Sequence, residues 1–200
     1  GAGVLAADAL AAAGGMLAPI PDATASRLNE VLPPSWSHGN PIDIIGDADT
    51  NRYREAVATL LADPETGALL ILNCPTAITP PLDVARAVAA EISRHPDRTV
   101  LTSWLGEQSA AAARELFGRH GIATYPTPEH AVQAFSHIVE YQRNQRMLRE
   151  VPATALLPFE PDRGAASTVV ANASDWLSPA DANRVLESYG IPVVTSVSAT

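Results

Sequence analysis

An uninterrupted apolar run at residues 68–72, Ala-Leu-Leu-Ile-Leu, constrains the fold of this chain more than any other feature. A strand with no polar alternation is buried on both faces, as strands of parallel sheets are. Residues 98–103 and 122–125 predict two further strands. Helical patterns at residues 50–62, 108–119 and 127–149, and one that starts at Pro80, alternate with these strands. The pattern over residues 42–150 therefore predicts a doubly wound α/β domain, a parallel sheet with helices on both faces.

The first helix is expected at residues 3–13, where apolar residues recur at helical spacing and Gly14 ends the run. Strand and helix alternate in this fold class, so a strand upstream of Gly1 is expected to precede this helix. A second short helix is expected at residues 24–31. Residues 33–48 predict a loop, a short strand around Ile42 and Ile44, and a second loop.

The C-terminal quarter has a different pattern. Three prolines, Pro152, Pro158 and Pro161, indicate a linker, which we place at residues 151–173. Ser178 and Pro179 are a helix cap and a first-turn proline. With an expected strand at residues 191–197, residues 174–200 are interpreted as the opening of a second domain.

Composition excludes several classes of protein. The net charge is −9 and no basic stripe is visible, which argues against nucleic acid as a partner. No segment approaches about 18 consecutive apolar residues, which argues against a membrane partner. The chain contains no lysine, so Schiff-base and P-loop lysine chemistry are excluded. Cys74 is the single cysteine and has no disulfide partner in the chain.

The first candidate site is the turn formed by Gly1, Ala2 and Gly3. Small residues at the start of a helix leave its free N–H groups open, and the helix dipole adds partial positive charge. Such a turn can bind phosphate. The alternative is a tight turn in which small residues merely fit.

The second candidate site is a loop that would lie at the end of a strand, where open α/β sheets bind ligands. Its acids can orient a loop or hold a metal, although so few oxygen ligands argue against a dedicated metal site. Local turn and cap hydrogen bonds are the alternative use of these residues. No metal ligand set and no complete catalytic site are visible. The loop motif comprises Asn40, Pro41, Asp43, Gly46 and Asp47.

These motifs resemble the NDP-forming (ADP-forming) acyl-CoA synthetases, relatives of succinyl-CoA ligase. The resemblance implies a flavodoxin-like, succinyl-CoA ligase-type domain at residues 1–150, the linker at 151–173, and the beginning of an ATP-grasp domain at 174–200. It rests on residues 1–10, 32–34, 40–48, 75–77, 104–106, 125–129 and 141–145.

The resemblance also implies a reaction. Acyl-CoA, ADP and phosphate are interconverted with acid, CoA and ATP through a phosphohistidine, and this domain supplies a helix N-terminus to the phosphate. No histidine here has the context of the phosphorylated loop, so none is assigned a catalytic role. The resemblance implies that ATP or ADP, Mg and CoA bind the full-length protein of which these 200 residues are a part. We expect this fragment alone to bind none of them and to be inactive.

The implied partners are the CoA-binding, phosphohistidine and ATP-grasp domains or subunits, in a cytoplasmic oligomer. A different function stays open, because in another branch a ligase-like region is fused to a GNAT protein lysine acetyltransferase and acts as its regulatory region. For the synthetase, the resemblance implies acetate or another small acid as the substrate.

Overall fold

The computed structural model describes residues 1–150 and 160–194. The chain divides into two compact units, Gly1–Met147 and Leu148–Thr200. Each unit is considered by itself.

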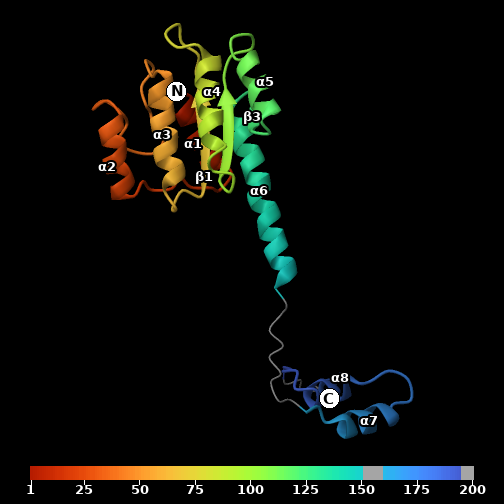
Figure 1. The fold of residues 1–200 in the computed structure, drawn as a ribbon. Helices are drawn as coiled ribbons and strands as arrows, with labels where there is room; N and C mark the ends of the chain where they lie inside the picture. The colour runs from red at the N-terminus through yellow and green to blue at the C-terminus, as the bar shows by residue number, and fades with distance from the viewer. Residues whose placement is uncertain (151–159, 195–200) are drawn as a thin grey trace. The chain divides into compact units, whose positions relative to one another are not determined.

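The first unit is built on a parallel sheet, shown in Figure 1. Its strands are β1 (Ala68–Asn73), β2 (Thr99–Trp104) and β3 (Ala123–Tyr125), in the order β1-β2-β3. Leu70 lies opposite Leu101, which in turn lies opposite Ala123. The predicted parallel sheet is confirmed, and its three strands fall where the apolar runs placed them.

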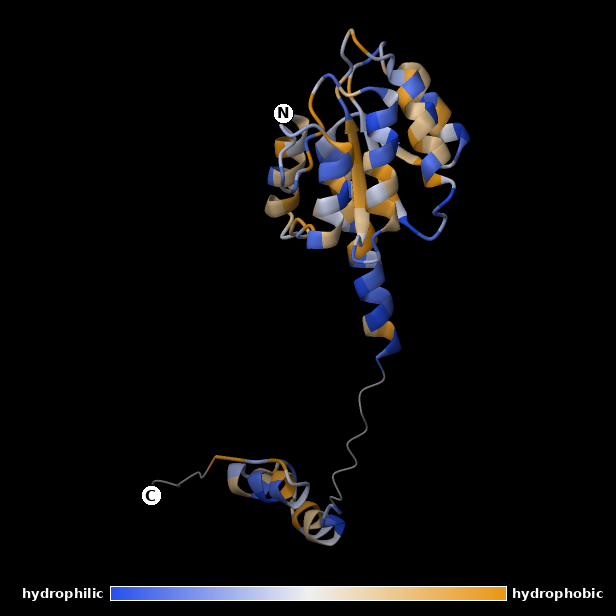
Figure 2. Ribbon diagram, turned by 60° about the vertical axis from the view of Figure 1, so that its left-hand side comes forward, coloured by the Kyte–Doolittle hydropathy of each residue, from blue (hydrophilic) through white to orange (hydrophobic). Residues whose placement is uncertain are grey.

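Four helices pack side by side in sequence order: α2 (Asp22–Val31), α3 (Thr50–Ala62), α4 (Pro81–Ile92) and α5 (Ala111–Arg119). The last three cover one face of the sheet, and α2 packs against α3. Hydrophobic residues run along the strand at the centre of Figure 2, whereas the outer helix surfaces are mixed. Trp104 and Phe117 meet edge to face at a centroid distance of 4.7 Å in the core beneath these helices. The main core cluster comprises Val57, Leu61, Ile71, Val84, Ala85, Val88, Ala89, Trp104, Ala110, Ala113 and Phe117.

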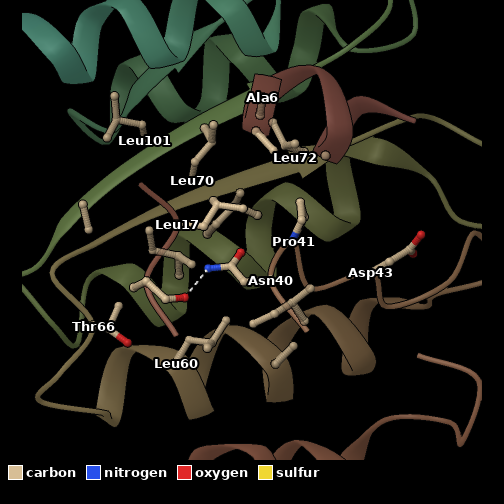
Figure 3. Close-up of a pocket in the computed structure, with 18 of the residues that line it drawn as sticks. Ala6, Leu17, Asn40, Pro41, Asp43, Leu60, Thr66, Leu70, Leu72 and Leu101 are labelled. Atoms are coloured by element: carbon tan, nitrogen blue, oxygen red, sulfur yellow. Dashed lines mark hydrogen bonds between the residues drawn. The ribbon is translucent and has the colours of Figure 1, made fainter. Parts of the chain in front are cut away.

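Two helices, α1 (Ala2–Ala12) and α6 (Pro128–Arg149), lie on the other side of the sheet. Ala6 of α1 lies over the β1 face that carries Leu70 and Leu72 (Figure 3). Ala131 and Val132 are the buried positions of α6 beside its first proline. Helices therefore cover both faces, as the sequence predicted.

A second core cluster joins α2 to α3. Leu28, Leu32, Trp36 and Ala56 are buried in it, with Ile42 and Ile44 packed against them. The Trp36 indole Nε1–H donates to Asn29 Oδ1 at 2.9 Å. This cluster anchors the loop that carries the second candidate site.

The prediction of a short strand around Ile42 and Ile44 is wrong, because residues 42–45 are not part of a sheet. Ile45 has a φ of 70°, which extended strands do not adopt. Its N–H donates to the Asp43 carboxylate at 2.8 Å rather than to a neighbouring strand. A side-chain turn has replaced the strand ladder here.

The second unit contains α7 (Arg163–Ala171) and α8 (Pro179–Ser188). Ser178 caps α8 by accepting the Asp181 N–H at 3.1 Å, which confirms the predicted helix start. Helix α7 occupies part of the segment 151–173 that composition assigned to a linker, and Asp162 caps it. Residues 191–194 do not form the expected strand, and residues 195–197 lie outside the described part. No helix within the described residues is long and apolar enough to cross a membrane.

Candidate functional site

The N-terminus of α1 is uncapped. Its N-cap is Gly1, no side chain bonds to the first turn, and that turn holds no acidic residue. The N–H groups of Val4 and Leu5 donate to the Gly1 carbonyl at 3.1 and 3.3 Å. Within the described residues, those of Ala2 and Gly3 have no partner. These two donors, together with the helix dipole, make this turn suitable for an anion.

The two motifs singled out from the sequence meet at Gly3. A Cβ placed on Gly3 would lie 3.1 Å from Pro41 Cβ, so α1 and the loop lie close enough that a side chain here would require Pro41 to shift by a few tenths of an ångström. The loop is also tied to the segment after α1, because Asn40 Nδ2 donates to the Ala18 carbonyl at 2.9 Å (Figure 3). The two candidate sites thus lie next to each other, with Gly1–Ala2–Gly3 beside Asn40–Pro41.

The same loop reaches the carboxyl end of β1. The Thr79 hydroxyl, in the segment that follows β1, donates to the Ala48 carbonyl at 3.2 Å. The Tyr53 hydroxyl, at the start of α3, donates to the Leu72 carbonyl at 3.3 Å. The candidate site therefore lies at the edge of the sheet where open α/β folds bind ligands.

The loop acids are engaged in local structure. Asp43 accepts the N–H of Ile45, and Asp47 forms an ion pair with Arg52, which also donates to the Ile44 carbonyl at 3.1 Å. Gly46 is exposed and has open space around it. Across residues 1–150 and 160–194, no group of three or more His, Cys, Asp or Glu side chains is arranged to hold a metal ion.

A large cavity of about 1060 Å³ opens beside this site. Every residue of β1 lines it, as do Gly1 and, on α1, Gly3 and Ala6. Figure 3 looks into the cavity, with Leu70 and Leu72 on β1 and with Leu60 on α3. Most of the exposed lining is apolar, so the cavity suits a hydrophobic occupant rather than a phosphate.

A buried polar pair at the end of β1 was not singled out from the sequence. Asn73 Nδ2 donates to the Tyr53 hydroxyl at 3.1 Å, and Asn73 Oδ1 is buried with no partner among the described residues. Burial raises the pKa of the Tyr53 phenol, while the hydrogen bond from Asn73 opposes that rise. One pattern in the sequence could have indicated this pair. An asparagine directly follows an apolar run, and a tyrosine lies on the inner face of the preceding helix.

Three further side chains show no arrangement for chemistry among the described residues. Cys74 is exposed. Trp104 is fully buried in the core, where its Nε1–H donates to the Pro81 carbonyl at 3.2 Å. His38 is exposed and its Nε2 lies 2.9 Å from the Pro34 carbonyl.

These features define a class of protein: a parallel α/β domain with an uncapped helix N-terminus and a proline-containing loop at one end of its sheet. Comparison with known families makes the assignment specific. The chain belongs to the Ligase-CoA domain family, whose model matches residues 1–149. This confirms the family resemblance carried by the sequence motifs.

Its relatives are ADP-forming acyl-CoA ligases. The chain is 29% identical over 202 residues to the ADP-forming acetate–CoA ligase of Methanocaldococcus jannaschii, covering 96% of this chain and 28% of that protein. It is 31% identical over 113 residues to the alpha subunit of ADP-forming acetate–CoA ligase I from Pyrococcus furiosus. That match covers 56% of this chain and 24% of the subunit. The chain thus spans about a quarter of the length of these relatives.

A solved structure has the same fold. It is the dinucleotide forming acetyl-coenzyme A synthetase 1 of Ca. Korarchaeum cryptofilum in complex with phosphate and ADP. The TM-score is 0.70 at 32% sequence identity, and the match covers 75% of this chain and 33% of that chain.

Proposed function

We propose that this chain is part of an ADP-forming acyl-CoA synthetase and that its α1 N-terminus receives a phosphoryl group carried by a phosphohistidine. The observation that carries the proposal is the uncapped first turn of α1, where the N–H groups of Ala2 and Gly3 have no partner among the described residues. The acetate–CoA ligase relatives and a solved relative bound to phosphate and ADP support the class of reaction.

The proposed reaction interconverts acyl-CoA, ADP and phosphate with acid, CoA and ATP. Phosphate displaces CoA from the acyl group, a histidine nitrogen takes the phosphoryl group from the acyl phosphate and releases the acid, and ADP then takes it from the histidine. That histidine is expected in another domain or subunit. The nucleotide, Mg and CoA are likewise assigned to those parts, in a cytoplasmic oligomer, and residues 174–200 to the start of an ATP-grasp domain.

The role of α1 in this scheme is electrostatic. A phosphoryl group on a neutral imidazole carries negative charge, which two free N–H donors and a helix dipole stabilise without a charged side chain. Pro41 packs beside this turn, since a side chain on Gly3 would meet its Cβ at 3.1 Å. The charge of Asp47, the last acid of the loop motif, is partly neutralised by its ion pair with Arg52.

The test uses the full-length protein that contains these residues, labelled with γ-labelled ATP. The expected label is acid-labile and base-stable, and ADP removes it. Ala2→Asp places a carboxylate on the first turn, where it favours the helix but repels phosphate. It should lower the label by about tenfold or more, since a like charge at a partly buried site costs more than 1.4 kcal/mol. Ala2→Asn is the matched neutral control and should keep the label.

Two outcomes would contradict the proposal. Equal labelling of Ala2→Asp, Ala2→Asn and the unaltered protein would show that α1 does not face the phosphoryl group. A complete absence of label from the unaltered protein would contradict the ligase reaction. If acetyl transfer from acetyl-CoA to a protein lysine accompanied that absence, the regulatory region of a GNAT acetyltransferase would be the better assignment.

A further inference from the structure

We propose that Arg114 of α5 is a positioning residue for the acyl substrate. It holds the loop that follows β2, residues 104–108, so that the N–H groups of Glu107 and Gln108 can donate to an acyl oxygen at the carboxyl end of the sheet. This inference rests on the proposed function, and it adds a substrate contact that the phosphoryl site at α1 does not provide.

Arg114 makes three hydrogen bonds to main-chain oxygens of this one loop. Its Nη1 donates to the Trp104 carbonyl at 2.8 Å and to the Gly106 carbonyl at 2.6 Å. Its Nη2 donates to the Glu107 carbonyl at 2.8 Å. The guanidinium is planar and presents its donors in a rigid fork, so these bonds fix the orientation of the three peptide groups that they reach.

The same bonds set the direction of the N–H groups in the loop. In a trans peptide, the C=O of one residue and the N–H of the next point in opposite directions. The Leu105 N–H belongs to the first of the three peptides and donates to the Asn73 carbonyl at 2.9 Å, so the direction away from the guanidinium leads there to the end of β1. The N–H groups of Glu107 and Gln108 belong to the other two peptides. They also point away from the guanidinium, and they have no partner among the described residues.

Gly106 holds the loop by its backbone conformation. Its φ is 96°, which residues with a side chain rarely adopt. A Cβ at this position would lie 2.5 Å from Ser109 Oγ and 3.7 Å from Pro75 Cγ, so the loop packs against its own turn and against the segment that follows β1. The two donors therefore lie by the carboxyl ends of β1 and β2, where open α/β folds bind ligands.

Two neighbouring N–H donors suit a carbonyl or carboxylate oxygen. In the proposed reaction, the thioester, the acyl phosphate and the acid all carry such an oxygen on the acyl carbon. Displacement of CoA by phosphate at that carbon places negative charge on this oxygen, and donors that are already in position stabilise it without reorganisation. The positive charge of Arg114 behind the loop acts in the same sense.

The test uses the full-length protein that contains these residues and separates the acyl step from the phosphoryl step. Labelling by γ-labelled ATP needs neither acid nor CoA, whereas formation of acetyl-CoA from acetate needs both. Arg114→Met removes the three donated bonds and should lower kcat/KM for acetate by about tenfold or more, as misplaced substrate contacts do. The label and the KM for CoA should stay unchanged. Arg114→Lys retains a cation and should have an intermediate kcat/KM.

Two further variants separate this role from a general loss of structure. Arg119→Met makes the same substitution at an exposed position of the same helix and should change neither reaction. Gly106→Ala leaves Arg114 in place but forces the loop to move, and it should lower kcat/KM for acetate in the same way. Near-UV circular dichroism shows whether each variant is folded. If Arg114→Met is not folded, Gly106→Ala and Arg114→Lys decide the question.

Three results would overturn the inference. Folded Arg114→Met or Gly106→Ala with an unchanged kcat/KM for acetate would show that the loop positions no substrate. An equal loss of label and of kcat/KM for acetate would assign Arg114 to the fold or to the phosphoryl step. Absence of label from the unaltered protein would overturn the proposed function and this inference with it, whereas the first two results leave the proposed function intact.

Discussion

At the scale of single residues, Gly3 decides how closely α1 approaches the loop. A side chain there meets Pro41 Cβ at 3.1 Å, whereas one on Gly1 meets nothing within 4 Å. We expect Gly3→Val to move the helix start or the loop and to lower the free energy of unfolding by about 1–3 kcal/mol, as overpacked sites do. Urea unfolding measures this change.

Gly1→Val is the control for that substitution, because it adds the same side chain two residues away in open space. It should change the urea midpoint by much less than Gly3→Val does. Equal effects of the two variants would mean that the contact with Pro41 does not limit the site.

Thr24 and Asp63 form a buried hydrogen bond that links stability to pH. The Thr24 hydroxyl donates to Asp63 Oδ2 at 2.7 Å and the Glu65 N–H donates to Oδ1 at 2.9 Å, which together hold the pKa of the Asp63 carboxyl below its ordinary value. Because the folded-state pKa is depressed, the ionised Asp63 carboxylate stabilises the fold at pH values above its unfolded-state pKa of about 4. This stabilisation is lost as the pH falls through the folded-state pKa.

Thr24→Val should therefore cost about 1–3 kcal/mol at neutral pH, because it removes a donor from a buried carboxylate. The cost should shrink below about pH 4, where the carboxyl becomes protonated. Unfolding free energies at a series of pH values measure this difference. Thr24→Ser keeps the hydroxyl and should keep the pH dependence; a Thr24→Val cost that is the same at every pH would refute the linkage.

At the scale of elements, helix α3 depends on a side-chain cap. The Asp49 carboxylate accepts the Arg52 N–H at 2.7 Å. We expect Asp49→Ala to lower the free energy of unfolding by about 1 kcal/mol, the usual value of an N-cap. Asp49→Ser keeps an acceptor and should lose less. Thermal unfolding compares the two, and an Asp49→Ala variant as stable as the Ser variant would show that the cap contributes nothing.

Local signals of this kind explain which elements were predictable. The cap at Ser178 and the apolar run of β1 act within a few residues, and the structure has both. The start of α4 differs slightly: the helix begins at Pro81 rather than Pro80. The preceding Thr79, a residue type that can cap helices, donates its hydroxyl to the Ala48 carbonyl instead. A partner 31 residues away has no local signal.

The candidate site shows the same limit. The small residues of α1 and the Asn40–Pro41 loop were each visible in the sequence, but their contact at Gly3 is tertiary. In place of the strand expected near Ile44 there is a turn, in which the Ile45 N–H donates to the Asp43 carboxylate. The pairing of Asn73 with Tyr53 also depends on the packing of α3 against β1.

At the scale of the whole molecule, the two compact units predict that the first one folds without the second. A chain ending at residue 150 retains both core clusters and all three strands. Its Tm should lie within about 4 °C of the unit-1 transition in the 200-residue chain, the shift that 1 kcal/mol produces in a domain of this size. Near-UV circular dichroism of the buried Trp36 and Trp104 follows that transition specifically.

A chain ending at residue 127 is the control for this truncation. It also removes α6, and with it the buried Ala131 and Val132. The sheet face that carries Leu101 would then lose apolar cover, because residues of α6 line the same cavity as Leu101. This shorter chain should lose its cooperative transition or melt far lower. If the chain ending at residue 150 behaved like the shorter one, then contacts from the second unit would be required for the first to fold, and the boundary near Met147 would not separate two folding units.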